Sequence, residues 1–223
     1  MPASTTPKLP PKAKPADVQA IFTTFEKAEP HPRTELLYTT PYQLLVAVVL
    51  SAQATDKSVN LATAPLFQQV ETPQQMLKLG EEGLTPFIKS IGLFRTKAKN
   101  VIALSQMLVE GYAGGLPTTM DDFIKLPGVG RKTANVMLNQ LHGHPTIAVD
   151  THVYRVARRL GLSRATTPDA VEADLYKIIP PIFQRHAHHW LILHGRYTCI
   201  ARNPRCASCP VEKWCHSPEK TIA

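Results

Sequence analysis

Four cysteines carry the most specific chemistry in the sequence. Cys199, Cys206, Cys209 and Cys215 are the only cysteines among 223 residues, and they fall within one short segment near the end. A secreted disulfide framework would spread its cysteines along the chain behind an export signal, and neither pattern is present. Four thiolates at this spacing can bind zinc or a [4Fe–4S] cluster. We expect metal ligation to hold this proline-containing, apolar-poor segment in shape.

A glycine-containing turn is the second feature that could take part in binding or catalysis. Residues 126–138 read LPGVGRKTANVML, and Gly128 and Gly130 stand between a short helix expected to end near Leu126 and another starting near Arg131. Glycines permit a tight turn, so backbone N–H groups at the second helix's N-terminus can approach an anion closely. A bare G-x-G more often only joins two packed helices, so a phosphate cradle and an ordinary turn both remain open.

Lys132 and Asp150 are two charged residues that chain geometry could bring to one cleft. A helix over 131–142 would carry the chain about 18 Å from the turn, and residues 143–149 can return by at most about 23 Å. Both residues can then stand at helix N-termini facing one cleft, with Asp150 as an N-cap. Desolvation and the helix N-terminus would favour the uncharged, nucleophilic amine. From spacing alone, the favoured roles are a phosphate contact for Lys132 and a plain N-cap for Asp150, rather than catalysis.

The elements that position these residues are predicted to be helices. Apolar residues recur at helical spacing, and the run 44–50 is apolar on every face, which predicts a buried central helix. Sustained strand-like alternation is missing, so we predict an all-α fold with about ten short helices. Helix starts are predicted at cap residues that precede a proline or an acidic or amide side chain, namely Thr40, Thr72, Thr119 and Thr167.

Composition restricts the partners and the compartment. The formal net charge of +8 favours an anionic partner such as nucleic acid. Residues 1–15 hold five prolines and three lysines, and we expect this tail to be disordered. The longest apolar run is too short to cross a bilayer, and neither a signal segment nor an Arg-rich transit segment is seen. We therefore expect a cytoplasmic protein with no membrane partner.

The motifs together resemble those of endonuclease III, a family of the helix-hairpin-helix DNA glycosylase superfamily. The resemblance covers roughly residues 16–216 and is carried by the cysteine spacing and by four segments, 44–60, 126–138, 146–161 and 188–206. It implies a two-domain architecture flanking a DNA-binding cleft. A six-helix domain would cover 34–144, and a [4Fe–4S] cluster domain would combine the N-terminal helix in 16–33 with 145–223.

The resemblance also implies an activity. The family excises oxidised pyrimidines from double-stranded DNA and cleaves the resulting abasic site by β-elimination. By this resemblance the protein is expected to be a monomer that is associated with the nucleoid through DNA. The cofactor implied is a [4Fe–4S] cluster, since only one C-x-x-C pair is present where zinc ribbons usually have two.

Individual roles follow from the motif match. Lys132 matches the family's nucleophile and Asp150 its essential aspartate, expected here to stabilise positive charge on the sugar or to relay a proton. Gln53 and Leu93 match residues that fill the gap left by an extruded nucleotide. Asn203 is neutral where the family pattern is basic. Further DNA contacts are implied for Gly128, Val129, Gly130, Arg131, His152, Arg202 and Arg205, and cluster ligation for Cys199, Cys206, Cys209 and Cys215.

Two other functions compete with this reading. A monofunctional glycosylase, such as the adenine-mismatch type, would lack Lys132 and is expected to carry a further C-terminal domain. A non-catalytic DNA-binding or redox-sensing protein would bind DNA without cleaving it. The histidines His186, His188 and His189 could suggest a second metal site, but packing or hydrogen bonding is the favoured interpretation.

Overall fold

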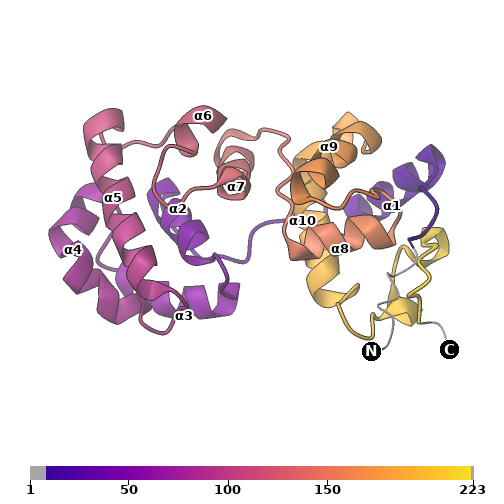
Figure 1. Cartoon of the computed structure of the whole chain (residues 1–223), viewed down its shortest axis with the longest axis horizontal. Helices are drawn as coiled ribbons and strands as arrows, with labels where there is room; N and C mark the ends of the chain where they lie inside the picture. The colour runs from indigo at the N-terminus through magenta and orange to yellow at the C-terminus, as the bar shows by residue number, and fades with distance from the viewer. Residues whose placement is uncertain (1–8, 222–223) are drawn as a thin grey trace, which may run out of the picture. The chain divides into compact units, whose positions relative to one another are not determined.

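The computed structural model describes residues 9–221, and this part of the chain contains helices and turns but no β-strand, which confirms the all-α prediction (Figure 1). No helix in these residues is long and apolar enough to cross a membrane. The α-helices are α1 (Pro15–Ala28), α2 (Pro41–Leu50), α3 (Asp56–Phe67), α4 (Pro73–Ile88), α5 (Phe94–Tyr112), α6 (Met120–Phe123), α7 (Arg131–His142), α8 (Thr151–Arg159), α9 (Pro168–Ile178) and α10 (Pro181–Tyr197), followed by the 3₁₀ turns η1 (Cys206–Ser208) and η2 (Glu212–Trp214).

Local signals place the helix starts where the sequence predicts them. At α4, Thr72 and Gln75 form a reciprocal capping box, in which each side chain accepts a hydrogen bond from the other residue's backbone N–H. The other three predicted caps also accept a backbone N–H of their own helix, at α2, α6 and α9. These bonds satisfy amides that a helix cannot satisfy internally. The four predicted helix starts are confirmed.

The chain divides into two compact units. Residues 34–144 form one unit and contain α2 to α7. Nine of the ten residues of α2 are buried, and α2 packs against α3, α5 and α7. α2 therefore forms the centre of the unit, as its uninterrupted hydrophobic run 44–50 predicts.

The second unit joins the two ends of the chain, residues 9–33 and 145–221 of the described structure. Its core is aromatic where α1 meets α10. The ring of Phe22 stacks on that of Phe183 with centroids 6.0 Å apart, and the indole Nε1 of Trp190 donates to the carbonyl of Glu29 at 2.8 Å. α8 packs against α10 and α9, so one core holds segments more than 150 residues apart (Figure 1).

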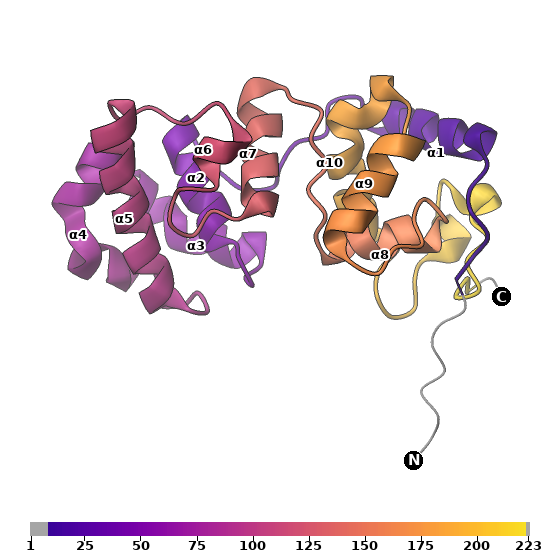
Figure 2. The same ribbon diagram turned by 45° about the horizontal axis from the view of Figure 1, so that its top comes forward.

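The N-terminal strap, residues 9–14, is ordered against this second unit (Figure 2). Pro10 is buried and its carbonyl accepts from Arg164 Nη2 at 2.7 Å, while Ala13 N donates to Gly161 O at 3.0 Å. The predicted disorder of residues 1–15 is therefore wrong for 9–15, because long-range partners satisfy the backbone. The remaining part of that prediction, residues 1–8, lies outside the described residues.

Candidate functional site

The helix-hairpin-helix turn connects α6 to α7. α6 ends at Phe123, earlier than predicted, and a hydrogen-bonded turn continues to Leu126. Val129 N donates to Leu126 O at 3.0 Å, which closes the hairpin. Gly128 has φ +78°, and a Cβ at this position would lie 3.0 Å from Asn100 Nδ2 of α5. The left-handed backbone therefore favours glycine at 128, and a Cβ there would also press on the side chain of Asn100.

Gly130 differs from Gly128 in both respects. It is the N-cap of α7 with φ −95° and ψ 177°, a conformation open to any residue. A Cβ at this position would meet no atom within 4 Å. The protein's own fold therefore does not require glycine at 130, whereas close approach of an external group would.

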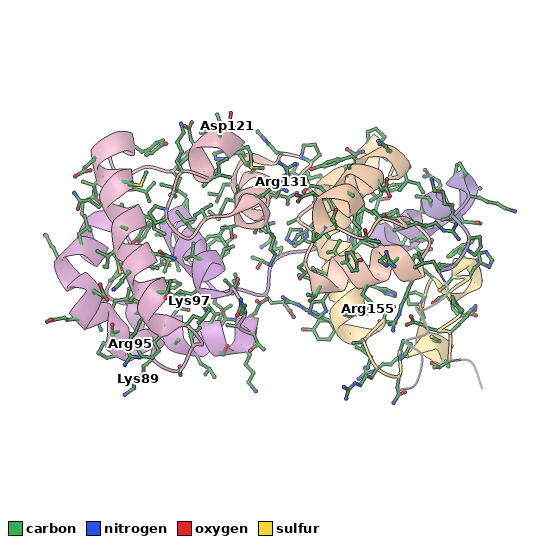
Figure 3. The ribbon with its side chains drawn as sticks, in the orientation of Figure 1. Lys89, Arg95, Lys97, Asp121, Arg131 and Arg155 are labelled. Carbon is green, nitrogen blue, oxygen red and sulfur yellow. The ribbon has the colours of Figure 1, made fainter. Side chains whose placement is uncertain are left out.

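The start of α7 is suited to an anion. No side chain caps this helix, and its first turn contains no acidic residue. The first two residues are Arg131, marked in Figure 3, and Lys132, and both are exposed. The helix dipole and two cations therefore favour negative charge here. Because Lys132 is exposed, the desolvation expected for its amine is absent from the protein alone.

Asp150 stands at the start of α8, as predicted. Its Oδ1 accepts from the backbone N–H groups of His152 and Val153, each at 2.8 Å, so the predicted N-cap is confirmed. His152 is half-buried, with its Nδ1 3.2 Å from Arg155 Nη2. Lys132 belongs to the unit 34–144 and Asp150 to the other unit, so each is fixed at a helix N-terminus within its own unit.

The two predicted wedge residues share an unusual backbone conformation. Gln53 follows α2 with φ 54°, and Leu93 precedes α5 with φ 60°. Left-handed backbone is disfavoured for residues with a Cβ and is concentrated at functional sites. Leu93 is also 60% exposed, although it is a large apolar residue. Both side chains are therefore held on turns of the same unit at a cost in backbone energy.

The four cysteines are brought together, all as free thiols. They line one pocket with His194 of α10. Burial raises the pKa of the Cys209 thiol to about 11 and also raises that of Cys215. Thr221 N donates to Cys206 Sγ at 3.4 Å. Within residues 9–221, no group of three or more His, Cys, Asp or Glu side chains is placed so that it could hold a metal ion.

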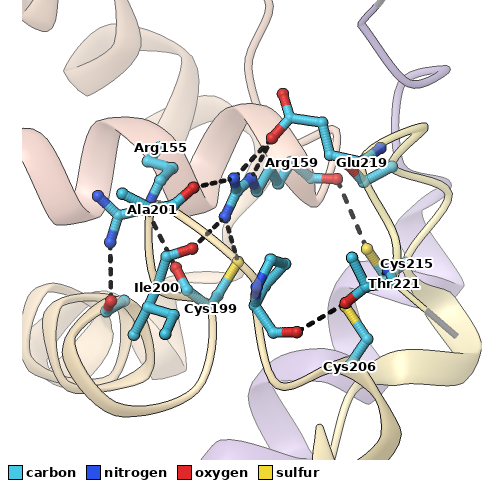
Figure 4. Close-up of polar contacts among 12 residues, drawn as sticks. Arg155, Arg159, Cys199, Ile200, Ala201, Cys206, Cys215, Glu219 and Thr221 are labelled. Atoms are coloured by element: carbon cyan, nitrogen blue, oxygen red, sulfur yellow. Dashed lines mark hydrogen bonds and ion pairs between the residues drawn. The ribbon is translucent and has the colours of Figure 1, made fainter.

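Arg159 at the end of α8 connects the cysteine segment to its surroundings (Figure 4). Its guanidinium donates to Ile200 O at 2.6 Å, to Ala201 O at 2.9 Å and to Cys199 Sγ at 3.6 Å. It also pairs with Glu219 through Nε at 2.8 Å and Nη2 at 2.6 Å. No local pattern marks Arg159 in the sequence, because its partners lie 40 to 60 positions away.

The loop between the first two cysteines carries the predicted basic side chains. Arg202 and Arg205 are both exposed. Between them, Asn203 has φ 52°, a left-handed conformation that asparagine tolerates better than most residues. The neutral residue is therefore well suited to the backbone of this loop.

The histidines of α10 have packing roles, as predicted. His188 is buried and its Nδ1 lies 2.7 Å from Ala148 O, while the ring of His186 packs 5.6 Å from that of Trp190. Burial lowers the pKa of His189 to about 3. A neutral, packed ring is the expected result for such a residue.

Comparison with known proteins defines the class. Residues 46–181 match the HhH-GPD superfamily of base excision DNA repair proteins. Among solved structures, a thermostable thymine-DNA glycosylase has the same fold, with a TM-score of 0.81 at 22% identity over 92% of this chain and 98% of that one. The fold and the hairpin thus belong to a helix-hairpin-helix repair protein.

More similar relatives identify the family. Endonuclease III of Rickettsia conorii is 58% identical over 89% of this chain and 94% of the relative, and that of Escherichia coli K12 is 52% identical over 90% and 95%. The structure of a trapped endonuclease III–DNA covalent intermediate matches with a TM-score of 0.85 at 43% identity, covering 92% of this chain and 96% of that one. The chain therefore belongs to the endonuclease III family, and it is a base excision repair enzyme with DNA glycosylase and AP lyase activity.

Proposed function

We propose that this enzyme removes oxidised pyrimidines from double-stranded DNA through a covalent intermediate on Lys132. The amine of Lys132 attacks C1′ of the extruded nucleotide, the glycosidic bond breaks, and the base leaves with the bonding electrons and takes up a proton. The sugar ring opens to a protonated Schiff base. Loss of a proton from C2′ then breaks the C3′–O bond and releases the 3′ phosphate.

Asp150 is proposed to stabilise the cationic sugar or to relay a proton. Its Oδ1 is engaged by two backbone N–H groups, which fix the carboxylate at the start of α8. Cleavage of a glycosidic bond develops positive charge on the sugar, and a fixed carboxylate stabilises that charge without reorganisation. Because Lys132 is exposed in the protein alone, bound DNA must provide the desolvation of its amine.

The observation that carries the DNA-binding part is Gly130. An uncapped helix start with two cations, preceded by a glycine that the fold itself does not need, is suited to a phosphate at close range. The left-handed turns at Gln53 and Leu93 support their assignment as wedges. The basic loop with Arg202 and Arg205, together with His152, supplies the remaining proposed DNA contacts.

The four cysteines are proposed to hold a [4Fe–4S] cluster. Four free thiols are the donor type of such a cluster and line one pocket, although their arrangement in the described structure is not yet that of a metal site; N–H groups of Arg159 and Thr221 donate to Cys199 and Cys206. When bound, the cluster would fix the basic loop in shape. Metal-replete protein is expected to be brown with about four irons per chain, and a colourless protein with one zinc would refute this assignment.

Borohydride trapping tests the nucleophile. Wild-type protein is expected to form a covalent complex with DNA that contains an oxidised pyrimidine, and Lys132→Ala should form none because the Schiff base cannot be made. Lys125→Ala, an exposed lysine just before the hairpin, is the matched control and should trap normally. Trapping of Lys132→Ala at the wild-type rate would remove the assignment. Binding without cleavage by the wild-type protein would favour a non-catalytic role.

The substitution Asp150→Asn distinguishes the N-cap role of this residue from the role of its negative charge. Asparagine is as good an N-cap as aspartate, so the stability of α8 should be preserved. We expect normal DNA binding with a single-turnover rate lowered by at least about a hundredfold, as for loss of an electrostatic stabiliser. An unchanged rate would contradict a role for the carboxylate charge.

We also propose that the enzyme acts as a monomer and is associated with the nucleoid through DNA, which sedimentation analysis with and without DNA tests.

A further inference from the structure

The amine of Lys97 in α5 is an unexplained buried group. Lys97 is only 4% exposed, and in the described structure its Nζ has no hydrogen-bond partner. Burial lowers the pKa of this lysine. A buried ammonium without a partner is costly, and native proteins rarely leave a buried polar group unsatisfied. The presence of lysine at this position therefore requires an explanation.

Lys97 occupies a core position of its helix. It begins a stripe of buried residues spaced at i, i+4, i+7 and i+11, in which the other three are Val101, Leu104 and Leu108, each with 0% exposure. Leucine or methionine would fill the first position without burying a charge. Departures from such a local rule are concentrated at functional sites.

The position of Lys97 connects it to the wedge turn. Lys97 N donates to Leu93 O at 3.0 Å, which forms the first turn of α5 directly on the left-handed residue. Side chains of an α-helix lean toward its N-terminus, so the stem of Lys97 runs back over the turn that carries Leu93. Figure 3 shows Lys97 near the start of α5, on the side that faces α2. One turn further along, Asn100 packs against Gly128 of the hairpin.

The electrostatic potential at the N-terminal end of α5 adds to the free-energy cost of burying the Lys97 ammonium. The first turn contains no acidic residue, and the helix dipole places positive potential at the same end. Lys89 and Arg95 lie in the same region (Figure 3). A polyanion covering this face would lower the energy of the buried ammonium, so its cost is greatest in the free protein.

We propose that Lys97 is a positioning residue for nucleotide extrusion. Its ammonium is a reserve donor, which binds main-chain carbonyls of the Leu93 turn when Leu93 enters the duplex and thereby holds the wedge in place. A donor without a partner in the free state and with one in the inserted state stabilises only the inserted state. This inference rests on the proposed wedge role of Leu93.

A stopped-flow measurement on the full chain tests the proposal. The probe is a duplex with a tetrahydrofuran abasic analogue opposite 2-aminopurine, whose fluorescence rises when the base unstacks. Lys97→Met keeps the length of the side chain and removes the charge, and the exposed Lys99→Met is the matched control on the same helix. Lys97→Met should slow the fluorescence rise by about tenfold, corresponding to one charge-assisted hydrogen bond. Its thermal unfolding midpoint should equal or exceed that of the wild type.

The outcomes separate three explanations. A wild-type rate in Lys97→Met, together with a slow rate in Leu93→Ala, would overturn the role of Lys97 and leave the wedge intact. A wild-type rate in Leu93→Ala would refute the wedge and the inference that rests on it. A lowered unfolding midpoint in Lys97→Met would identify an ordinary structural lysine. Slowed extrusion without lost stability is the result that supports the proposal.

Discussion

The two hairpin glycines allow a sharp test of phosphate binding, because they differ in what the fold requires of them. Alanine at 128 must adopt φ +78° and meet Asn100 at 3.0 Å. The left-handed conformation alone costs about 1–2 kcal/mol, so Gly128→Ala should lower the free energy of unfolding by at least that amount. The tight contact with Asn100 adds to this cost.

Gly130→Ala is expected to leave stability almost unchanged. The extended backbone accepts alanine, and the gain of about 0.4–1 kcal/mol from a stiffer unfolded chain offsets alanine's poorer capping. The new methyl group should instead push a phosphate away from the amides of α7. Loss of hydrogen bonds to one charged oxygen costs about 1.5–3 kcal/mol, so affinity should fall by about tenfold to a hundredfold.

The assay pairs urea unfolding with titration of an abasic-analogue duplex at several salt concentrations. For Gly130→Ala, the slope of log affinity against log salt concentration should become shallower by the amount that corresponds to about one phosphate contact. Gly128→Ala provides the comparison, because its effect on stability should exceed that of Gly130→Ala. Wild-type affinity in Gly130→Ala would refute the reasoning that an external group explains the glycine.

Three further predictions follow from strained or buried groups. Gln53→Gly should raise the free energy of unfolding by about 1 kcal/mol by relieving the left-handed backbone, yet slow the 2-aminopurine signal; unchanged stability in urea would argue against strain. Arg159→Met removes the donors to the cysteine segment, so iron content measured after dialysis against a chelator should fall below that of the exposed control Arg202→Met, and equal retention would contradict the link. Burial lowers the pKa of His189 from 6.5 to about 3, so below pH 6.5 the unfolded chain binds more protons than the folded one. Stability should therefore fall as the pH drops from 6.5 toward 3, by about 2 kcal/mol at about pH 5 for this group, and urea unfolding of His189→Phe should show a flatter pH dependence.

Local sequence signals predicted the elements well. The cap at Thr72 with its partner Gln75, and the cap at Asp150, depend on residues within three positions of one another. Such bonds form whatever the rest of the fold does, which explains why helix starts could be read from the sequence. The run 44–50 of α2 was equally visible, because every side chain in it is apolar.

Features fixed by distant partners could not be predicted. The N-terminal strap is ordered by Arg164, some 150 residues away, and its own composition indicates only disorder. The left-handed positions themselves are Gln53 and Leu93, neither of which is a glycine. Lysine is ordinarily an exposed residue, so its type does not predict the burial of Lys97. In each case tertiary structure overrides the local preference, and the motif match identified the wedge residues where residue type alone could not.

The joining of both chain ends in one core has a consequence for biosynthesis. α1 leaves the ribosome early, but its partner α10 is made more than 150 residues later. Residues 34–144 can fold in the interval, since domains generally fold as units during synthesis. The four thiols lie beyond α10, so the proposed iron cluster can be assembled only after residue 215 has been made. A message cut short before codon 199 would yield a product that keeps α1 and α10 but lacks every proposed ligand.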